Sequence, residues 1–447
     1  MIYFNIFIND YININKFKIF AVISSINLYI FFIKDYKSYV NFNNTNNTDL
    51  TNITYNSFTN NITDLNSLIY NLNLYSNYTK KTNIIFSDYI ISKSCYDKNA
   101  YILFEYYLNN NIDIPYYIIN KDSDFYKSLI KSNKTKNLIL YTEKNEKNFY
   151  KDLFEYLKDA KIIINSYSLF FLQHVASNVS YIKYLRINHG IKYFKVFIAQ
   201  NEIIKSLGDK TNVICSSPFE YKLLTKSSNY KKEYIHNASL VRYERFQFIK
   251  KNKSEKKCIL VSFTYRYFDK YNFEKSDYKK NLGHLLNDEE LLKYLYNKDI
   301  NLVYIPHHEE IDLGKNYSQK LFKYAQIKNQ SKLEHYIEQC SLLITDFSSI
   351  CFDFMFQNKI VLFYEIDKNN ENSYYQNNYR IKPNDTLFFG NYFSKKNLLI
   401  EKIKYYIDNN FEIGEKLKQN YESVFFIKKN IIIKLIEIIN DIVERKR

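Results

Sequence analysis

Short apolar runs alternate with amphipathic stretches along the chain from about residue 82 onward. The runs have the length of buried strands, and the stretches repeat their apolar positions as helices do. The first series predicts strands at 83–87, 116–119, 138–141, 160–165 and 181–188, with helices at 98–109 and 125–131. The second predicts strands at 257–263, 301–305, 341–345 and 360–364, with helices at 288–296, 333–339 and 349–357. This alternation predicts an α/β fold with parallel sheets built from βαβ units.

A charged stretch, KKNKSEKK at 250–257, separates the two series and has the composition of an interdomain linker. We therefore expect one Rossmann-like domain over 81–250 and a second over 251–425. A basic amphipathic helix is expected to follow over 426–447. Two such domains face each other across a cleft, and a ligand binds there at the carboxyl ends of the strands.

The first 80 residues form an extension with a different pattern. Its most apolar segment, 19–33, has 15 residues and includes Ser24, Ser25 and Asn27, whereas a membrane span needs about 20 apolar residues. We expect a buried strand or helix, or an interfacial contact, in preference to a span or a signal peptide. The Asn/Thr/Ser-rich stretch 41–79 predicts a linker or a loosely packed extension.

Composition narrows the class of protein. A hydrophobic fraction of 46% excludes disorder along the whole length, and only 6 Gly and 4 Pro exclude a collagen-like chain. The net charge is +16; residues 1–80 hold five Lys and four Asp with no Arg or Glu, which leaves +15 on the rest. This charge suits an anionic membrane surface, nucleic acid or a phosphate-rich small molecule. No nucleic-acid-binding signature is present, so nucleic acid is not an expected partner.

The cysteines indicate a reducing compartment. There are five, an odd number, and none forms a C-x-x-C pair. We therefore expect neither a disulfide framework nor a zinc ribbon, and the cytoplasm as the location.

A histidine and a glycine followed by two lysines close one predicted strand of the first series, in HGIKYFK at 189–195. Gly190 permits close backbone approach, and Lys192 or Lys195 could meet a phosphate. The imidazole of His189 suits a general base that deprotonates a hydroxyl near neutral pH. The pattern alone leaves a structural histidine as the other interpretation.

In the second series, LLITDFSSICFD at 342–353 predicts a buried strand that runs into Asp346 and then into a helix. The unpaired amides of a helix start, with the hydroxyls of Ser348 and Ser349 beside them, form an anion site suited to a pyrophosphate. Asp346 or Ser348 could instead cap the helix. The two interpretations are compatible.

Two further strand ends carry candidate residues. One ends in Thr264-Tyr265-Arg266, where a guanidinium could form two hydrogen bonds to phosphate oxygens. The other ends in His307 and His308, followed by Glu309. A zinc site is disfavoured there, because adjacent side chains on an extended segment point in opposite directions. The chain contains neither G-x-G-x-x-G nor a P-loop motif.

These motifs, in this order, resemble the CDP-glycerol:poly(glycerophosphate) glycerophosphotransferase family of teichoic-acid and capsule synthesis. HGIKYFK, FTYR, IPHH and LLITDFSSICFDFMFQNKIVLFYEID are similar to the family's H-G-x-x-x-(x)-K, P-T-[WF]-R, H-P and T-D-Y-S-S-x-x-F-D-x-x-x-x-x-K-P-V-x-F-Y patterns. SSPFE and SLVR look like its S-x-x-E and G-L-P-R segments. The resemblance covers roughly residues 82–425. Four prolines of these patterns are replaced here, by Val241, Phe263, His308 and Ile360.

The resemblance implies a GT-B fold, with the acceptor on the N-terminal domain and the nucleotide on the C-terminal one. It implies transfer of a glycerol phosphate or ribitol phosphate from a CDP-linked donor to a hydroxyl, with release of CMP and without a cofactor or a required metal. The implied catalytic residues are His189, as base on the acceptor hydroxyl, and Asp346, which shapes the donor loop. The implied substrate-binding residues are Gly190, Lys192, Lys195, Glu220, Arg242, Arg266, His307, His308, Thr345, Ser348 and Ser349.

Two other functions compete with this one. A GT-B glycosyltransferase using a CMP- or UDP-sugar carries similar motifs, and a non-catalytic membrane-associated binding protein could keep the fold. The charge and the amphipathic end 431–447 also predict peripheral contact with the inner face of the cell membrane, where a polyprenyl-linked or glycan acceptor would lie. A solvated helix end is the other interpretation of that segment.

Overall fold

The computed structural model contains two compact units, residues 1–61 and 62–447. It describes residues 17–23, 28–34, 62, 64–76, 81–88, 90, 98–142, 146–167, 170–191, 211–227, 230–247, 257–264, 266, 276–307, 326–328, 332–346, 348–367 and 391–445. In the first unit, β1 (Phe17–Ile23) and β2 (Leu28–Lys34) pair as antiparallel strands. The described residues of the apolar segment 19–33 therefore lie in two paired strands. Among the described residues no helix is long and apolar enough to cross a membrane.

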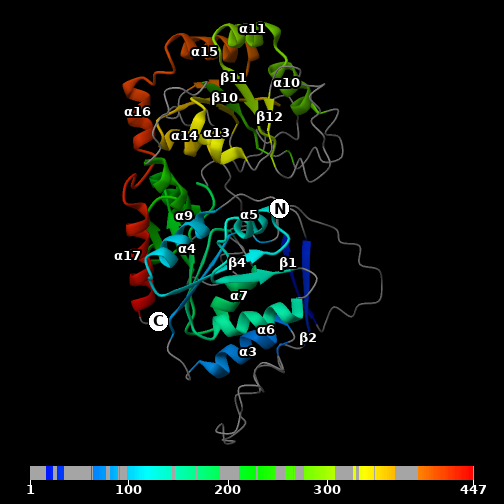
Figure 1. Ribbon diagram of the computed structural model, residues 1–447, viewed down its shortest axis with the longest axis vertical. Coiled ribbons are helices and arrows are strands. Elements are labelled where there is room, and N and C mark those ends of the chain that lie inside the picture. The colour runs from blue at the N-terminus through cyan, green and yellow to red at the C-terminus, as the bar shows by residue number, and fades with distance from the viewer. Residues whose placement is uncertain are drawn as a thin grey trace, which may run out of the picture. The chain divides into compact units, whose positions relative to one another are not determined.

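The second unit contains two parallel sheets, and the first of them has seven strands in the order β5-β4-β3-β6-β7-β8-β9 (Figure 1). Its strands are β3 (Asn83–Ser87), β4 (Ile114–Asn120), β5 (Leu138–Tyr141), β6 (Ala160–Asn165), β7 (Lys183–Arg186), β8 (Asn212–Cys215) and β9 (Ile235–Asn237). The chain leaves β3 toward one edge and returns to β6 on the other side of β3. The strand order therefore reverses between β3 and β6.

Helices connect the strands of this sheet and cover it. They are α3 (Leu65–Tyr75), α4 (Asn99–Asn109), α5 (Asp124–Lys131), α6 (Glu146–Leu157), α7 (Phe170–Asn178) and α9 (Pro218–Ser227), with the 3₁₀ helices η5 (Lys232–Tyr234) and η6 (Val241–Gln247). Figure 1 shows α3, α6 and α7 together near one face.

Helix α3 corrects the expectation of a loose linker over 41–79. Asp64 and Ser67 form a capping box at its start, in which each side chain accepts from the other residue's backbone amide. Leu68 and Leu72 are fully buried on one face of the helix. An Asn-rich segment thus forms a capped helix that belongs to the second compact unit.

The second sheet has six parallel strands in the order β12-β11-β10-β13-β14-β15. Its strands are β10 (Cys258–Val261), β11 (Asn301–Tyr304), β12 (Gln326–Ile327), β13 (Leu342–Thr345), β14 (Ile360–Tyr364) and β15 (Asn391–Phe393). Its helices are α10 (Asp277–Leu286), α11 (Glu289–Asn297), α13 (Leu333–Gln339), α14 (Ile350–Phe356), α15 (Lys396–Asp408) and α16 (Glu415–Glu422). Here the order reverses between β10 and β13.

The expected α/β class with two parallel sheets is confirmed. Strands expected at 83–87, 138–141, 160–165 and 360–364 have those bounds in the structure, and 181–188 shortens to Lys183–Arg186. Residues 250–256 of the expected linker lie outside the described residues. The domain boundaries at 80, 250 and 425 remain predictions.

The described residues contain one disulfide, which the spacing of the cysteines did not indicate. Cys258, at the start of β10, forms a disulfide with Cys340, just before β13, 82 residues later in the chain. β10 and β13 are adjacent and parallel, so their amino ends bring the two sulfurs together. Cys215 and Cys351 are buried.

The C-terminal helix α17 (Ile431–Glu444) returns to the first sheet, where it packs on η6 and β7 (Figure 1). Its apolar face is buried in the same core cluster as strands of both sheets, through Ile431, Ile432, Leu435, Ile438, Ile439 and Ile442. Its end is held by Lys183, which donates to the Arg445 carbonyl at 2.9 Å. The apolar face of this segment is therefore occupied within the protein.

His236 in β9 makes the fold sensitive to acid. Its Nε2 lies 2.9 Å from Asn212 Oδ1, and burial, with the nearby charge of Arg445, lowers the pKa of His236 from 6.5 to about 4. The unfolded chain thus binds a proton more readily than the folded one between these values. We expect the thermal midpoint to fall as pH drops from about 6.5 toward 4, and His236→Asn to flatten that decline; calorimetry across this range measures both. An unchanged pH slope in the variant would contradict this assignment.

Candidate active site

The carboxyl ends of β10, β11 and β13 lie side by side at one edge of the second sheet. In the ladder, Val261 pairs with Tyr304 on one side and with Ile344 on the other. The segments that follow these strands carry Thr264, His307 and Asp346. The sheet order reverses at β10 and β13, and ligands of open α/β sheets bind outside the strand ends at such a reversal.

Asp346 ties the segment after β13 to the segment after β10. Its Oδ1 accepts from the Thr264 amide at 3.0 Å, from the Thr264 hydroxyl at 2.9 Å and from the Ser348 amide at 3.1 Å. Its Oδ2 accepts from Arg266 Nη1 at 2.7 Å. With 1% exposure, Asp346 shapes the loop from within and does not project into solvent.

Arg266 is held between two buried carboxylates. Besides Asp346, it makes a two-point contact with Asp367, Nε to Oδ2 at 2.7 Å and Nη2 to Oδ1 at 2.9 Å. Its Nη1 also donates to the Thr264 carbonyl, and the guanidinium lies 4.7 Å from the Tyr278 ring centre. Its exposure is 2%. The side chain predicted to contact phosphate is thus engaged within the protein, and the geometry supports a positioning role.

The three hydroxyl residues of this loop have different surroundings. Thr345 is fully buried and donates to the Ser262 carbonyl at 2.6 Å, which locks β13 to β10. Ser348 and Ser349 are partly exposed. Ser349 is the N-cap of α14 and makes no side-chain cap hydrogen bond. Of the three, Ser348 and Ser349 are therefore the ones accessible to a ligand.

The loop that carries His189 follows β7 in the first sheet. Asn188 has a positive φ of 55°, and its Nδ2 donates to the Ile214 carbonyl at 2.8 Å, which turns the chain at the strand end. The His189 ring lies 4.7 Å from the Tyr167 ring, centre to centre, at 37°. His189 is partly exposed, and its contact with the Tyr167 ring restricts the orientation of its own ring.

Gly190 brings the two sheets together. A Cβ added there would lie 2.9 Å from Ser349 Oγ and 3.2 Å from Ser349 Cβ. The His189–Gly190 loop of the first sheet is therefore packed directly against the serine loop of the second. Two motifs 159 residues apart in the chain, which the sequence presents separately, are thus in contact.

This contact leads to a stability prediction. Gly190→Ala is expected to lower the free energy of unfolding by about 1–3 kcal/mol, because the added methyl overpacks a close contact. The double variant Gly190→Ala/Ser349→Gly should lose less free energy of unfolding than the sum of the losses in the two single variants, as measured by urea unfolding. Gly283→Ala on α10 is the matched control, since nothing lies within 4 Å of its added Cβ. Strict additivity of the pair would contradict the contact.

Arg242 and Glu220, the other two residues implied by the motifs, are also engaged internally. Arg242, in η6, makes a two-point ion pair with Asp353 of α14 and donates to the His189 carbonyl. Glu220 is 2% exposed and accepts from the Ser216 amide at 2.8 Å, next to the end of β8. Its carboxylate adds to burial in raising the pKa of the Cys215 thiol. Both residues support strand-end loops.

Three predicted residues have no described side chain: Lys192, Lys195 and His308 lie outside the described residues. His307 follows β11 and is partly exposed at the same strand-end edge. Two residues that the sequence reasoning missed are Asp353 and Asp367. Both stand inside the quoted motif 342–367, but only their long-range partners, Arg242 and Arg266, show what they do.

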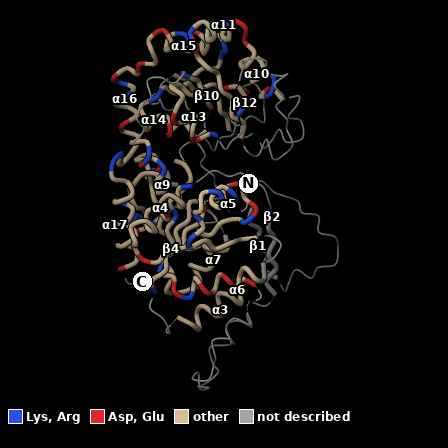
Figure 2. The backbone as a smooth tube through the Cα atoms, viewed as in Figure 1, with Lys and Arg blue, Asp and Glu red and all other residues tan. Residues whose placement is uncertain are grey.

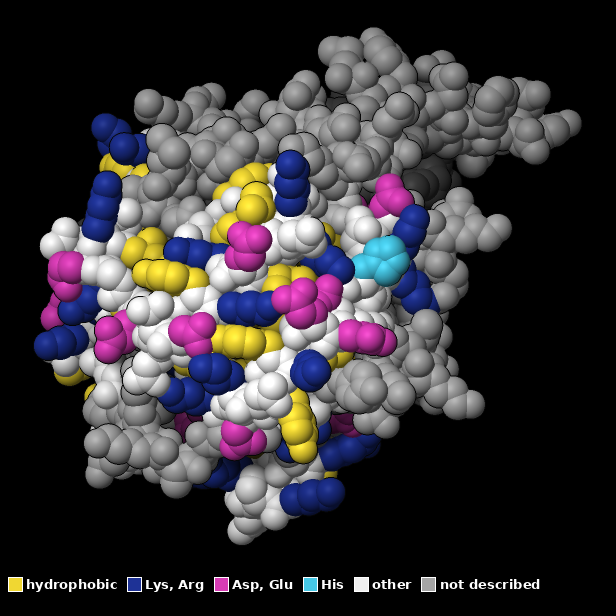
Figure 3. Space-filling model, turned by 90° about the horizontal axis from the view of Figure 1, so that it is seen from above, with side chains coloured by type: hydrophobic (Ala, Val, Ile, Leu, Met, Phe, Trp, Pro, Cys, Tyr) yellow, Lys and Arg dark blue, Asp and Glu magenta, His cyan; other side chains and the backbone are white. Residues whose placement is uncertain are grey.

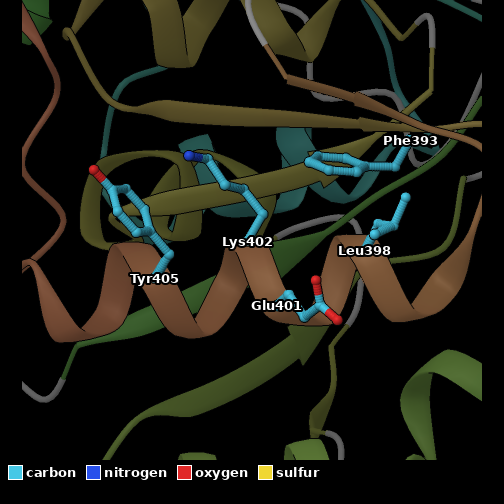
Figure 4. Close-up of a pocket in the computed structure, with 5 residues that line it drawn as sticks. All are labelled: Phe393, Leu398, Glu401, Lys402 and Tyr405. Atoms are coloured by element: carbon cyan, nitrogen blue, oxygen red, sulfur yellow. The ribbon is translucent and has the colours of Figure 1, made fainter.

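A surface cavity of about 360 Å³ lies on another part of the second sheet. It is lined by Phe393 of β15 and by Leu398, Glu401, Lys402 and Tyr405 of α15 (Figure 4). Lys402 Nζ lies 3.9 Å from the Tyr405 ring centre. None of the predicted site residues lines this cavity. Within the described ranges, no group of three or more His, Cys, Asp or Glu side chains could hold a metal ion.

Comparison with known proteins identifies a matching family and an individual relative. The family model described as CDP-Glycerol:Poly(glycerophosphate) glycerophosphotransferase matches residues 68–429. The Minor teichoic acid biosynthesis protein GgaB of Bacillus subtilis (strain 168) is 26% identical over 371 residues, which cover 74% of this chain and 36% of that protein. The chain thus spans about a third of the length of that relative.

Solved structures share the fold. The wall teichoic acid polymerase TagF has a TM-score of 0.59 at 15% identity, covering 87% of this chain and 92% of that one. The S. aureus MnaA–UDP co-structure has a TM-score of 0.53 at 12% identity, covering 82% and 99%. The GT-B prediction is confirmed by the likeness to TagF. Since the family match spans most of the sequence, the chain belongs to the CDP-Glycerol:Poly(glycerophosphate) glycerophosphotransferase family.

Proposed function

We propose that this chain transfers an alditol phosphate, of the glycerol phosphate or ribitol phosphate type, from a CDP-linked donor to a hydroxyl of a cell-surface polymer. The observation that carries the proposal is the contact of Gly190 with Ser349. It places the loop that carries the partly exposed His189 against the partly exposed serines of the second sheet. Family membership supports the same chemistry, and a TagF structure was soaked with CDPG.

The proposed reaction is a displacement at phosphorus. The acceptor hydroxyl oxygen attacks the alditol-bearing phosphorus of the donor, and the bond from that phosphorus to the bridging oxygen breaks. CMP leaves with the bridging oxygen, and the hydroxyl proton passes to the imidazole of His189. Ser348 and Ser349 hold the pyrophosphate through their hydroxyl groups, while Thr345, Asp346 and Arg266 fix their loop.

A panel of donors tests this function. Purified protein is incubated with CDP-glycerol, CDP-ribitol, CMP-sialic acid and UDP-sugars, each with an acceptor glycan, and release of CMP or UDP is measured. We expect CMP release with a CDP-alditol. Turnover with UDP-sugars alone would replace the proposal by a glycosyltransferase, and donor binding without turnover of any donor would replace it by a binding protein.

We further propose a polyprenyl-linked or glycan acceptor presented at the inner face of the cell membrane. The net charge supports contact with anionic lipid. Because the apolar face of α17 is buried, this contact would be electrostatic and weaken with salt. Lys and Arg are interspersed with Asp and Glu along the chain (Figure 2). The same mixture covers the face that is seen from above in Figure 3. Flotation with anionic liposomes should show binding at low salt only, and no binding at low salt would rule the contact out.

A further inference from the structure

Helix α14 and the 3₁₀ helix η6 form a packed junction between the two sheets. Tyr243 of η6 stacks on Phe356 of α14 with ring centres 4.4 Å apart and an interplanar angle of 28°. Phe425 meets both rings, at 5.8 Å from Tyr243 and 5.1 Å from Phe356. Tyr243 is fully buried, and Phe356 and Phe425 are buried. The two helices are therefore joined by an apolar contact that leaves little freedom for one to shift without the other.

A buried ion pair crosses the same junction. Arg242 Nε lies 2.6 Å from Asp353 Oδ1, and Arg242 Nη2 lies 3.0 Å from Asp353 Oδ2. The Asp353 side chain is 2% exposed and that of Arg242 15%. A two-point contact between a planar guanidinium and a carboxylate fixes both distance and orientation, which a single contact does not.

The remaining guanidinium nitrogen of Arg242 contacts the His189–Gly190 loop. Its Nη1 donates to the backbone carbonyl of His189. The base of the side chain is fixed as well, since the Arg242 amide donates to Asn99 Oδ1 at 3.0 Å and Asn99 is fully buried at the start of α4. Arg242 thus joins three elements, α4, the His189 loop and α14.

Asp353 stands four residues after Ser349, one turn along α14. At one end of this turn, Ser349 touches Gly190, and at the other, Asp353 holds the arginine that holds the His189 carbonyl. The position of His189 is therefore set by the same helix that begins at the serine loop.

We propose that Arg242 and Asp353 are a positioning pair that sets the place of His189 relative to the serine loop of the second sheet. The pair does not contact the substrate; it transmits the position of α14 to the catalytic loop. The inference rests on the proposed function for its kinetic readout. It replaces the substrate-binding role that the sequence motif implied for Arg242, and it gives Asp353 a role.

Asp353→Asn tests the pair with little change in shape. We expect kcat for CMP release to fall about 100-fold, because displacement of a catalytic group by a fraction of its contact distance has effects of this size. The dissociation constant of the CDP-linked donor, measured by calorimetry, should stay within about threefold, since the serine loop keeps its own contacts with Asp346. Arg242→Lys, which keeps the charge and loses the two-point contact, should also lower kcat and leave donor affinity unchanged.

Glu338→Gln is the matched control. Arg245 belongs to η6 as well, and it pairs with Glu334 at 3.1 Å and Glu338 at 3.2 Å on α13 of the second sheet. This contact joins the same two sheets through α13 and not through α14, the helix whose N-cap is Ser349. If the ion pairs at the junction have only a structural role, kcat should fall by a similar factor in both variants. If Arg242 and Asp353 are a positioning pair, kcat should fall in Asp353→Asn alone.

Hydrogen exchange separates this inference from the proposed function. We expect faster deuterium uptake over residues 186–191 in Asp353→Asn than in the wild type, and no change in Glu338→Gln. If the wild type turns over no donor, the proposed function fails, and exchange alone still decides the pair. The proposal would be overturned if Asp353→Asn took up deuterium over residues 186–191 at the wild-type rate. It would also be overturned if this variant kept the wild-type kcat, or if it lost only donor affinity.

Discussion

Replacement of His189 by alanine is expected to lower CMP release by about 10²–10⁴-fold while donor binding is kept. That range is typical of the loss of a general base, and His189 adjoins Gly190, which contacts Ser349. The carbonyl of His189, which Arg242 holds, is unchanged by the substitution. Initial rates with a CDP-linked donor, together with calorimetric titration of that donor, measure the two quantities.

His284→Ala is the control for this prediction. His284 is exposed on α10, outside the segments that follow the strand ends, and its loss should leave the rate unchanged. Equal rates for His189→Ala and the wild type would remove His189 as the base. A parallel loss of donor affinity and rate would assign His189 to donor binding.

The sheets were predictable because their strands are short apolar runs that end at polar residues. Strands 83–87 and 160–165 are buried along most of their length, so the apolar run and the strand coincide. The pairing of β1 with β2 was not predicted, because both strands overlap one apolar segment and its composition does not show which residues pair. Helix α3 was missed because Asn-rich composition obscures the spacing of its two buried leucines, Leu68 and Leu72.

The candidate site was predictable in its residue types and not in its pairings. Arg242 was named only by the family resemblance, and Arg266 was recognised as a cation at a predicted strand end, where a phosphate could reach it. Their partners, Asp353 and Asp367, stand 111 and 101 residues away, and no local pattern shows such a pair. The same limit applies to the disulfide of Cys258 and Cys340 and to the contact of Gly190 with Ser349. Long-range pairing decides whether a charged side chain meets a ligand or holds a loop.

Arg266→Ala is expected to destabilise the protein by about 3–5 kcal/mol, the cost of breaking a buried ion pair by removal of one partner. Both Asp346 and Asp367 would remain buried, at 1% exposure each, without the guanidinium between them. Because Asp346 also holds the Ser348 amide, donor affinity should fall with stability. Urea unfolding and donor titration measure the two effects.

Two other variants separate a buried charge network from a surface charge. Asp367→Asn keeps an oxygen that can accept from Arg266, so we expect a smaller loss of stability and a nearly intact serine loop. Lys127→Gln removes an exposed pair, Lys127 to Asp124 at 3.0 Å with side chains 61% and 62% exposed, and should change stability by less than about 1 kcal/mol. If Arg266→Ala unfolds at the wild-type urea concentration and only loses donor affinity, Arg266 contacts the donor's phosphates directly, as the sequence motif implied. If Arg266→Ala loses both stability and donor affinity, and Asp367→Asn has values between those of Arg266→Ala and the wild type, Arg266 supports the loop.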